Sequence, residues 1–161
     1  MGIRDTLNKK KGVGPAVAGI LIVIGVGLIF FMNRGTPGPL TQMYYSDDDG
    51  KTFFTDDADK VYPFDHKGKQ AYRAYVFRCS DGKTFVGYLE RYSDDAKGKA
   101  TALQGKSGSE AEFAQIRQNG LEVKKPGDTN WVNTLSRAAE DVMNSARCPD
   151  GTSKGMRGVT P

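Results

Sequence analysis

One unbroken apolar segment dominates the hydrophobic pattern of the chain. Val13 to Met32 (VGPAVAGILIVIGVGLIFFM) contains twenty residues without a charged side chain. A helix of that length rises about 30 Å, which matches the hydrocarbon core of a bilayer. A buried core helix is the alternative, but the run is long and uninterrupted, and lysine and arginine residues flank it. The pattern therefore predicts a transmembrane helix over residues 13–32.

The segments that follow show the alternation and turns of antiparallel strands. Two strand pairs are predicted, and they cover residues 43–46 with 52–54 and residues 70–79 with 84–91. The Asp-Gly at 49–50 is typical of a hairpin connection, because these residues adopt positive φ readily. Both period-two faces of 70–79 are apolar, so we expect this strand to lie centrally in its sheet.

Helix signals gather in the second half of the chain. Ser109 with Glu112 matches a capping box, and the apolar pattern behind it stops at Gly120. Apolar residues recur at helical spacing from about 134 to 147, which predicts an amphipathic helix. A short strand is expected at 121–125. Residues 94–108 fit either a frayed helix or a mobile loop.

These elements predict an α+β protein. We expect one N-terminal transmembrane helix and a small antiparallel-sheet domain of two β-hairpins, covered by one or two helices. The predicted organisation is a basic cytoplasmic tip (1–12), the transmembrane helix (13–32), a linker (33–42), the exported α+β domain (43–148) and a disordered tail (149–161).

The charges on the two sides of the apolar run give its orientation. Four basic residues precede the run, against one acidic residue, and they are Arg4, Lys9, Lys10 and Lys11. The positive-inside rule places this end in the cytoplasm and the chain from about residue 33 outside it. A cleaved secretory signal is the rival interpretation. It has a shorter apolar stretch and an A-x-A-like exit, whereas this exit reads Met32-Asn33-Arg34-Gly35. We therefore expect an uncleaved signal-anchor in the inner membrane.

The net charge of +4 comes from the same N-terminal region. Of 23 basic and 19 acidic residues, five basic and one acidic lie within the first 34. The remainder of the chain is neutral, with 18 of each sign. The basic composition therefore indicates topology and contact with the lipid bilayer, and it excludes nucleic acid as the expected partner.

The chain has two cysteines, and both fall in the part expected to be exported. They are Cys79, at the end of a predicted strand, and Cys148, behind the last predicted helix. Because oxidising compartments favour disulfides, we expect these two to be bonded, with two buried free thiols as the alternative. A nucleophilic pair of Cys79 with His66 has no local support in the sequence.

An acidic stretch raises the question of a metal site. Aligning Gly50 with the sixth position of an EF-hand loop makes Asp47, Asp49 and Asp56 weak calcium-ligand candidates, but Tyr45 stands at the first position. The flanks also have strand character, so a solvated turn is the simpler interpretation. No metal or cofactor is expected, and the absence of a phosphate loop, nucleophile elbow or zinc helix motif argues against an enzyme.

Aromatic residues are concentrated in the first half of the predicted domain. We expect these rings to pack in the core, because a small domain needs large apolar side chains inside. Stacking on the sugar rings of a glycan is the alternative. His66 is expected on a surface loop, and Trp131 is expected to fill the core.

Two resemblances to known proteins extend these expectations. The sequence Lys9-Lys10-Lys11-Gly12 before an apolar helix resembles the cleavage site of type IV pilins and pseudopilins, which implies a mature start at Val13. The family's glutamate is replaced here by Val17. The anchor, the segment YYSDDDGKTFF, the hairpin at 74–92 and the late Cys-Pro-Asp-Gly resemble uncharacterised bacterial single-pass membrane-anchored exported proteins. That resemblance implies topology and no activity.

The favoured function is a membrane-anchored, non-enzymatic accessory or interaction subunit of a bacterial cell-envelope complex. Gly14 and Ala18 offer a small-xxx-small surface for packing against another membrane helix. The alternatives are a pseudopilin-like filament or secretion subunit, and an exported module that binds calcium or a glycan.

Overall fold

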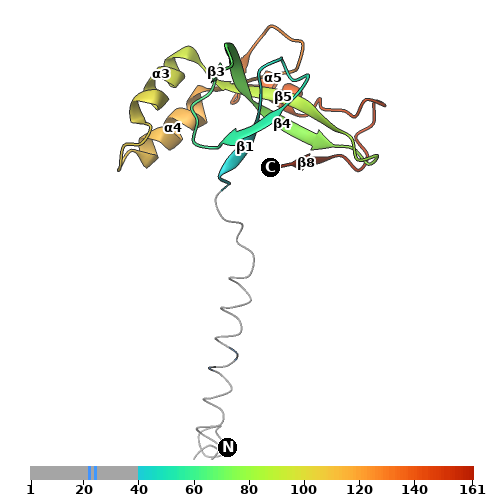
Figure 1. The fold of residues 1–161 in the computed structure, drawn as a ribbon, viewed down its shortest axis with the longest axis horizontal. Helices are drawn as coiled ribbons and strands as arrows, with labels where there is room; N and C mark the ends of the chain where they lie inside the picture. Colours follow the sequence, from blue (N-terminus) through green and yellow to red (C-terminus); the bar gives the residue numbers. More distant parts are fainter. Residues whose placement is uncertain (1–21, 23, 25–39) are drawn as a thin grey trace, which may run out of the picture. The chain divides into compact units, whose positions relative to one another are not determined.

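The computed structural model describes residues 22, 24 and 40–161 (Figure 1). The chain divides into two units, Met1–Pro39 and Leu40–Pro161. Ile22 and Ile24 are helical and exposed. The rest of the predicted transmembrane segment, with Gly14 and Ala18, lies outside the described residues. Among the residues that are described, no helix is both long and apolar enough to cross a bilayer.

The second unit is an antiparallel sheet with three helices, which confirms the predicted α+β class. The strand order is β2-β1-β4-β5-β6-β7, and β3 and β8 also pair with β4. The strands are β1 Gln42–Ser46, β2 Phe54–Asp57, β3 Phe64–His66, β4 Lys69–Arg78, β5 Thr84–Tyr92, β6 Leu121–Lys124, β7 Val132–Asn133 and β8 Arg157–Val159. The helices are α3 Asp94–Leu103, α4 Glu110–Gly120 and α5 Arg137–Met143.

Both predicted strand pairs are present, but the second strand of the first pair is Phe54–Asp57, where residues 52–54 were predicted. β4 and β5 pair from Arg73↔Glu90 to Arg78↔Thr84, with a bulge after Tyr75, and β4 lies between β1 and β5 as expected. β1 pairs with β2, but their connection is longer than a tight turn. Side chains organise that loop, because Gly50 N–H donates to the Ser46 hydroxyl at 2.8 Å.

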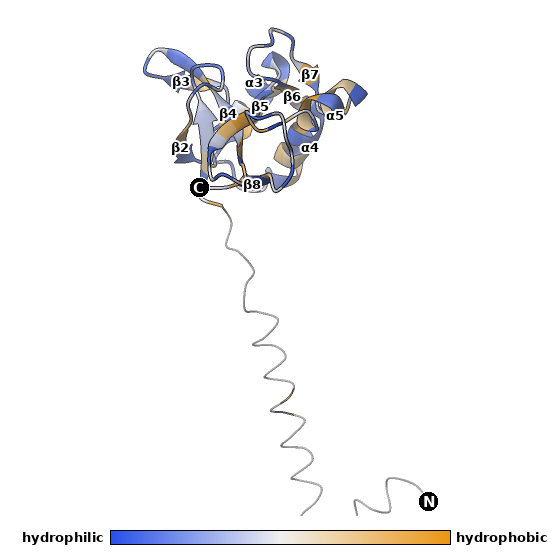
Figure 2. Ribbon diagram, turned by 90° about the vertical axis from the view of Figure 1, so that its right-hand side faces the viewer, coloured by the Kyte–Doolittle hydropathy of each residue, from blue (hydrophilic) through white to orange (hydrophobic). Residues whose placement is uncertain are grey.

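Side chains divide between the two faces of the sheet by the alternation of the strands. On one face a buried cluster joins the sheet to α3 and α4, and its members are Tyr45, Val61, Tyr62, Tyr92, Ala96, Ala100 and Leu121. A second cluster of Ala74, Val76, Val86 and Leu89 lies on the other face. The third joins α5 to β6 through Val123, Ala139 and Val142. The helices all lie to one side of the β4–β5 hairpin (Figure 2).

The described domain has three helices, where one or two were expected. Residues 94–103 form α3 because its buried alanines, Ala96 and Ala100, are spaced to lie on one helical face against the sheet. α4 begins after Ser109, but this residue makes no side-chain cap. Its hydroxyl donates instead to the carbonyl oxygen of Lys106 at 2.6 Å. α5 is shorter than predicted, since Ser136 caps it and Leu135 stays 66% exposed.

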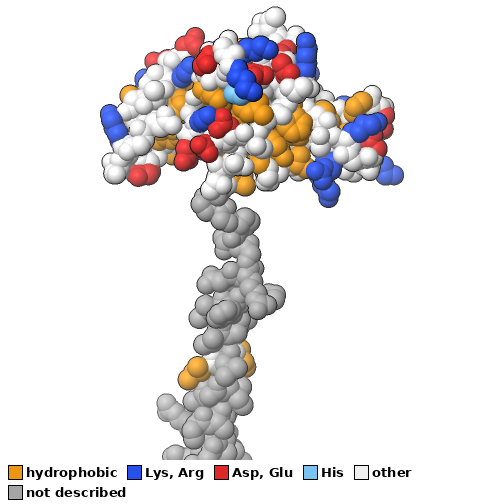
Figure 3. Space-filling model, in the orientation of Figure 1, with side chains coloured by type: hydrophobic (Ala, Val, Ile, Leu, Met, Phe, Trp, Pro, Cys, Tyr) orange, Lys and Arg blue, Asp and Glu red, His pale blue; other side chains and the backbone are white. Residues whose placement is uncertain are grey.

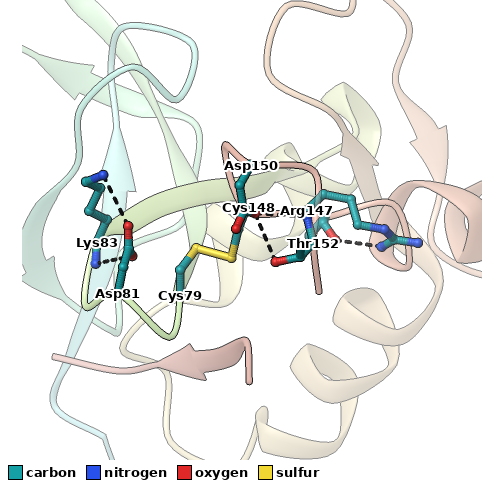
Figure 4. Close-up of a disulfide and its surroundings, with 8 residues drawn as sticks. Cys79, Asp81, Lys83, Arg147, Cys148, Asp150 and Thr152 are labelled. Carbon is teal, nitrogen blue, oxygen red and sulfur yellow. Dashed lines mark hydrogen bonds and ion pairs between the residues drawn. A yellow bond between two sulfur atoms is a disulfide. The ribbon is translucent and has the colours of Figure 1, made fainter. Parts of the chain in front are cut away.

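The C-terminal segment 149–161 was expected to be a disordered tail, but part of it is a strand of the sheet. Arg157–Val159 forms β8, which pairs with β4 through Val76↔Val159. The physical reason is that Cys148 is bonded to Cys79 at the end of β4, which brings the following residues beside that strand (Figure 4). Val159 then packs against the second core cluster.

Candidate functional site

A buried glutamate lies near the open end of the β4–β5 hairpin, in the pair farthest from the turn. Glu90 is 5% exposed, and three side chains hydrogen-bond to its carboxylate. The Tyr62 hydroxyl and Arg73 Nη1 donate to Oε1 at 2.6 and 3.1 Å. The Tyr75 hydroxyl donates to Oε2 at 3.0 Å. We call these four residues the Glu90 cluster.

The strand register assembles this cluster. Arg73 on β4 is the direct neighbour of Glu90 on β5, and Tyr75 lies two residues further along the same face. Tyr62 comes from the segment before β3. The guanidinium of Arg73 also lies over the Tyr75 ring, 4.7 Å from its centroid, so ring and carboxylate hold it from two sides.

Burial and the neighbouring charge set the protonation states of the cluster. Burial raises the pKa of the Tyr62 and Tyr75 phenols, and the negative charge of Glu90 raises both further. Burial alone would lower the pKa of Arg73, but Tyr75, Glu90 and Tyr62 outweigh it and hold that pKa above its ordinary value. The phenols therefore remain proton donors and Arg73 stays charged at neutral pH.

A cavity of about 600 Å³ opens beside Arg73. Its walls come from the start of β1, the segment 58–62, and the α3–α4 hairpin. Its charged side chains are the cations Lys60, Arg73, Lys106 and Arg117 and the carboxylates Asp59 and Glu110. Aromatic lining comes from Tyr62, Tyr92 and Phe113. We call this space the Arg73 cavity.

Hydrogen bonds fix the connection that forms one wall of this cavity. Gln104 Nε2 donates to the carbonyl oxygen of Asp59 at 2.8 Å, which ties the end of α3 to the segment before β3. The Ser109 hydroxyl bridges the turn by donating to the carbonyl oxygens of Lys106 and Leu103. The cavity is thus formed by backbone that the described domain holds in place.

A second, apolar hollow lies at the edge of β4 between β1 and β8. It has a volume of about 180 Å³ and includes Leu40, Tyr44, Val76 and Val159. Apolar side chains gather on the face of the domain drawn in Figure 3.

The three aspartates considered for calcium each bind a different partner. Asp47 contacts His66 Nδ1 at 2.7 Å. Asp49 pairs with Lys124, and Asp56 with Lys60, each at 2.5 Å. Each carboxylate is therefore occupied by a different cationic or imidazole side chain, and the three do not form a common calcium site. Within residues 40–161, no group of three or more His, Cys, Asp or Glu side chains is placed to hold a metal ion.

The cysteines, His66 and Trp131, which the sequence singled out, all make contacts that stabilise the fold. Cys79 and Cys148 form the predicted disulfide, with their Cα atoms 5.9 Å apart, so the Cys79 sulfur is not a free nucleophile (Figure 4). His66 stacks on Phe54 with ring centroids 4.0 Å apart. Trp131 is half-buried, and its ring lies 5.1 Å from that of Tyr72, on the face away from the Arg73 cavity.

No motif in the sequence pointed to the Glu90 cluster. One signal was available, because alternation places Glu90 on the same face of its strand as the aromatic residues Tyr88 and Tyr92. A carboxylate at such a position needs a cationic or hydrogen-bonding partner. Comparison with protein-family models finds no match, and comparisons with curated proteins and with solved structures find none either.

Proposed function

We propose that this chain is a membrane-anchored, non-enzymatic binding subunit of a bacterial cell-envelope complex, with residues 40–161 outside the cytoplasm. The observation that carries the proposal is the Cys79–Cys148 disulfide in a domain that follows a twenty-residue apolar segment with a lysine-rich flank. Disulfides persist in oxidising compartments, and the positive-inside rule gives the same orientation independently.

The Arg73 cavity supports a binding role. Concave sites with apolar walls and a few fixed polar groups are typical of ligand recognition. The Glu90 carboxylate is already engaged by Tyr62, Arg73 and Tyr75, so it supports Arg73 instead of offering a general base. These contacts favour recognition over catalysis.

Location is tested with reporters fused behind Pro161. Alkaline phosphatase, which folds only outside the cytoplasm, should be active, and a fluorescent protein that folds in the cytosol should stay dark. Unreduced protein should resist alkylation at both cysteines, while the Cys148→Ser variant should expose one reactive thiol. Cytosolic fluorescence with two alkylated cysteines would overturn the proposal.

Assembly is tested by photo-crosslinking in native membranes. A photoreactive residue is placed at Lys106, on the cavity rim, and in a matched chain at Arg137, on α5. We expect one discrete adduct from position 106 and none from position 137. Monomer alone at both positions would count against a binding subunit.

The pilin-like motif Lys9–Gly12 favours a second candidate, a pseudopilin-like filament or secretion subunit. Mass spectrometry of the N-terminus separates the two. A mature chain starting at Val13 supports processing of the pilin type, and an intact N-terminus overturns it.

A further inference from the structure

Four cations and two carboxylates line the Arg73 cavity, and two of the cations are already paired. Lys60 pairs with Asp56 and Arg73 pairs with Glu90. Within residues 40–161, neither Lys106 nor Arg117 takes part in an ion pair. Asp59 and Glu110 in the same lining form no ion pair within residues 40–161 either, so the charges of these four side chains balance. The preference of the cavity for an anion therefore depends on the N–H donors of Arg73.

Arg73 is preorganised to receive that group. Its side chain is 17% exposed, and Glu90 together with the Tyr75 ring holds the guanidinium in place. The hydrogen bonds that it makes within the described domain all use Nη1. A guanidinium has five N–H donors, so others remain for a ligand in the cavity. Binding there loses little side-chain entropy.

Part of the cavity wall offers contact to an apolar body on the ligand. Tyr92 and Phe113 lie edge to face with centroids 6.5 Å apart, and Met43 and Leu103 extend the apolar lining. A ligand seated against such walls displaces water and strengthens an ionic contact made beside them. The volume of about 600 Å³ lies within the range of small-ligand sites, roughly 300–1,000 Å³.

The two carboxylates in the lining favour a singly charged anion. Asp59 and Glu110 both line the cavity with the four cations. A phosphate monoester carries about −1.5 to −2 charges at neutral pH, so these carboxylates repel it more strongly than a carboxylate with one charge. They also offer acceptors for amide N–H groups of a ligand.

We infer that the Arg73 cavity binds a carboxylate carried on an aromatic or branched apolar body. Arg73 and Arg117 are the cations that receive the carboxylate, and Tyr92 with Phe113 contacts the apolar body. The inference rests on the proposed binding function and names its ligand class. The carboxyl end of a partner polypeptide and a small organic acid both present this chemistry.

The test uses the full chain in phosphatidylcholine nanodiscs and ligand-observed NMR. N-acetyl-L-phenylalanine is compared with N-acetyl-L-phenylalaninamide, which has the same body without the charge. We expect the acid to bind and the amide to bind about tenfold more weakly, which corresponds to about 1.4 kcal/mol. A peptide ending in phenylalanine is the second arm: tighter binding than the acetylated amino acid assigns the site to a chain end, and equal binding assigns it to a small acid.

Matched variants place the binding in the cavity. Arg117→Gln is expected to weaken binding of the acid about tenfold, and Lys106→Gln is expected to weaken it less. Arg137→Gln removes the same charge from α5 and should leave binding unchanged. The fluorescence of Trp131 checks that each variant is folded.

Equal affinity for acid and amide, or wild-type affinity in a folded Arg117→Gln variant, would overturn the inference. If the adduct from position 106 forms in membranes while no carboxylate binds, the ligand class is wrong and the binding function stands. If neither the adduct nor carboxylate binding is observed, the ligand class and the binding function are both overturned.

Discussion

Replacing Arg73 by methionine removes the cation from the Glu90 cluster and keeps an apolar stem of similar length. The side chains of Arg73 and Glu90 are only 17% and 7% exposed, so the remaining carboxylate would stay buried without its counter-charge. Breaking a buried pair from one side costs about 3–5 kcal/mol of unfolding free energy. Two phenols still donate to Glu90, which favours the lower end of that range.

A double-mutant cycle isolates the interaction between the two charges. In Arg73→Met/Glu90→Gln both charges are gone, and the glutamine oxygen can still accept from a phenol. The double variant should therefore lose less stability than the sum of the single variants, with a coupling energy of about 1.5–3 kcal/mol. The control cycle uses Asp95 and Lys99, whose side chains are 79% and 61% exposed. Exposed pairs at this helical spacing couple by about 0.3–0.5 kcal/mol.

The assay is urea unfolding of the full chain in nanodiscs, followed by the fluorescence of Trp131. This is the chain's single tryptophan, and its ring contacts both the Tyr72 ring and the guanidinium of Arg91, which lies 4.7 Å from the ring centroid. Its emission therefore reports unfolding of the sheet. A coupling energy for Arg73–Glu90 no larger than that of the control pair would refute the account of the cluster.

Three further predictions use the same assay. Gly87→Ala should lower the free energy of unfolding by about 1–3 kcal/mol through overpacking, because a Cβ there comes within 2.5 Å of a neighbouring ring carbon. Gly98→Ala should raise it by about 0.5–1 kcal/mol, because alanine favours the helix and its Cβ meets nothing within 4 Å. Cys148→Ser should cost about 2–4 kcal/mol, and an unchanged urea midpoint would contradict a stabilising disulfide. Burial raises the pKa of Tyr88 and Tyr92 to about 12 from the ordinary 10, so the folded state keeps these protons at a higher pH than the unfolded state does. The free energy of unfolding should therefore be unchanged below pH 10 and fall as the pH rises toward 12. Phenolate absorbance near pH 10 that still-folded protein loses in the Tyr88→Phe or Tyr92→Phe variant would contradict this.

The elements that sequence predicted well are those with a local cause. β4 and β5 follow from two long apolar and aromatic runs on either side of a short polar connection, and β6 follows from a run bounded by Gly120 and Pro126. Alternation, turn residues and helix stops act over a few positions, so they can be read without knowing the rest of the fold.

The elements that sequence did not predict, or left open as it left α3 between a frayed helix and a mobile loop, depend on distant contacts. β8 has three residues and forms because the disulfide and the edge of β4 hold it, which no pattern within 149–161 records. α3 has a weak helical sequence with two glycines nearby, and its buried alanines matter only once the sheet lies beneath them. Tertiary packing decided both cases.

The candidate site is a stronger case of the same dependence. The sequence of β5 shows that Glu90 needs a partner, but several arginines and lysines lie near enough along the chain to supply one. The β4–β5 register selects Arg73. That choice has a consequence for binding, because the partner that neutralises the buried glutamate also lines the cavity. The guanidinium shares the burial cost of Glu90 with two phenols through Nη1. Under the proposed binding function its other N–H groups contact the ligand, so a change at either residue should alter stability and recognition together.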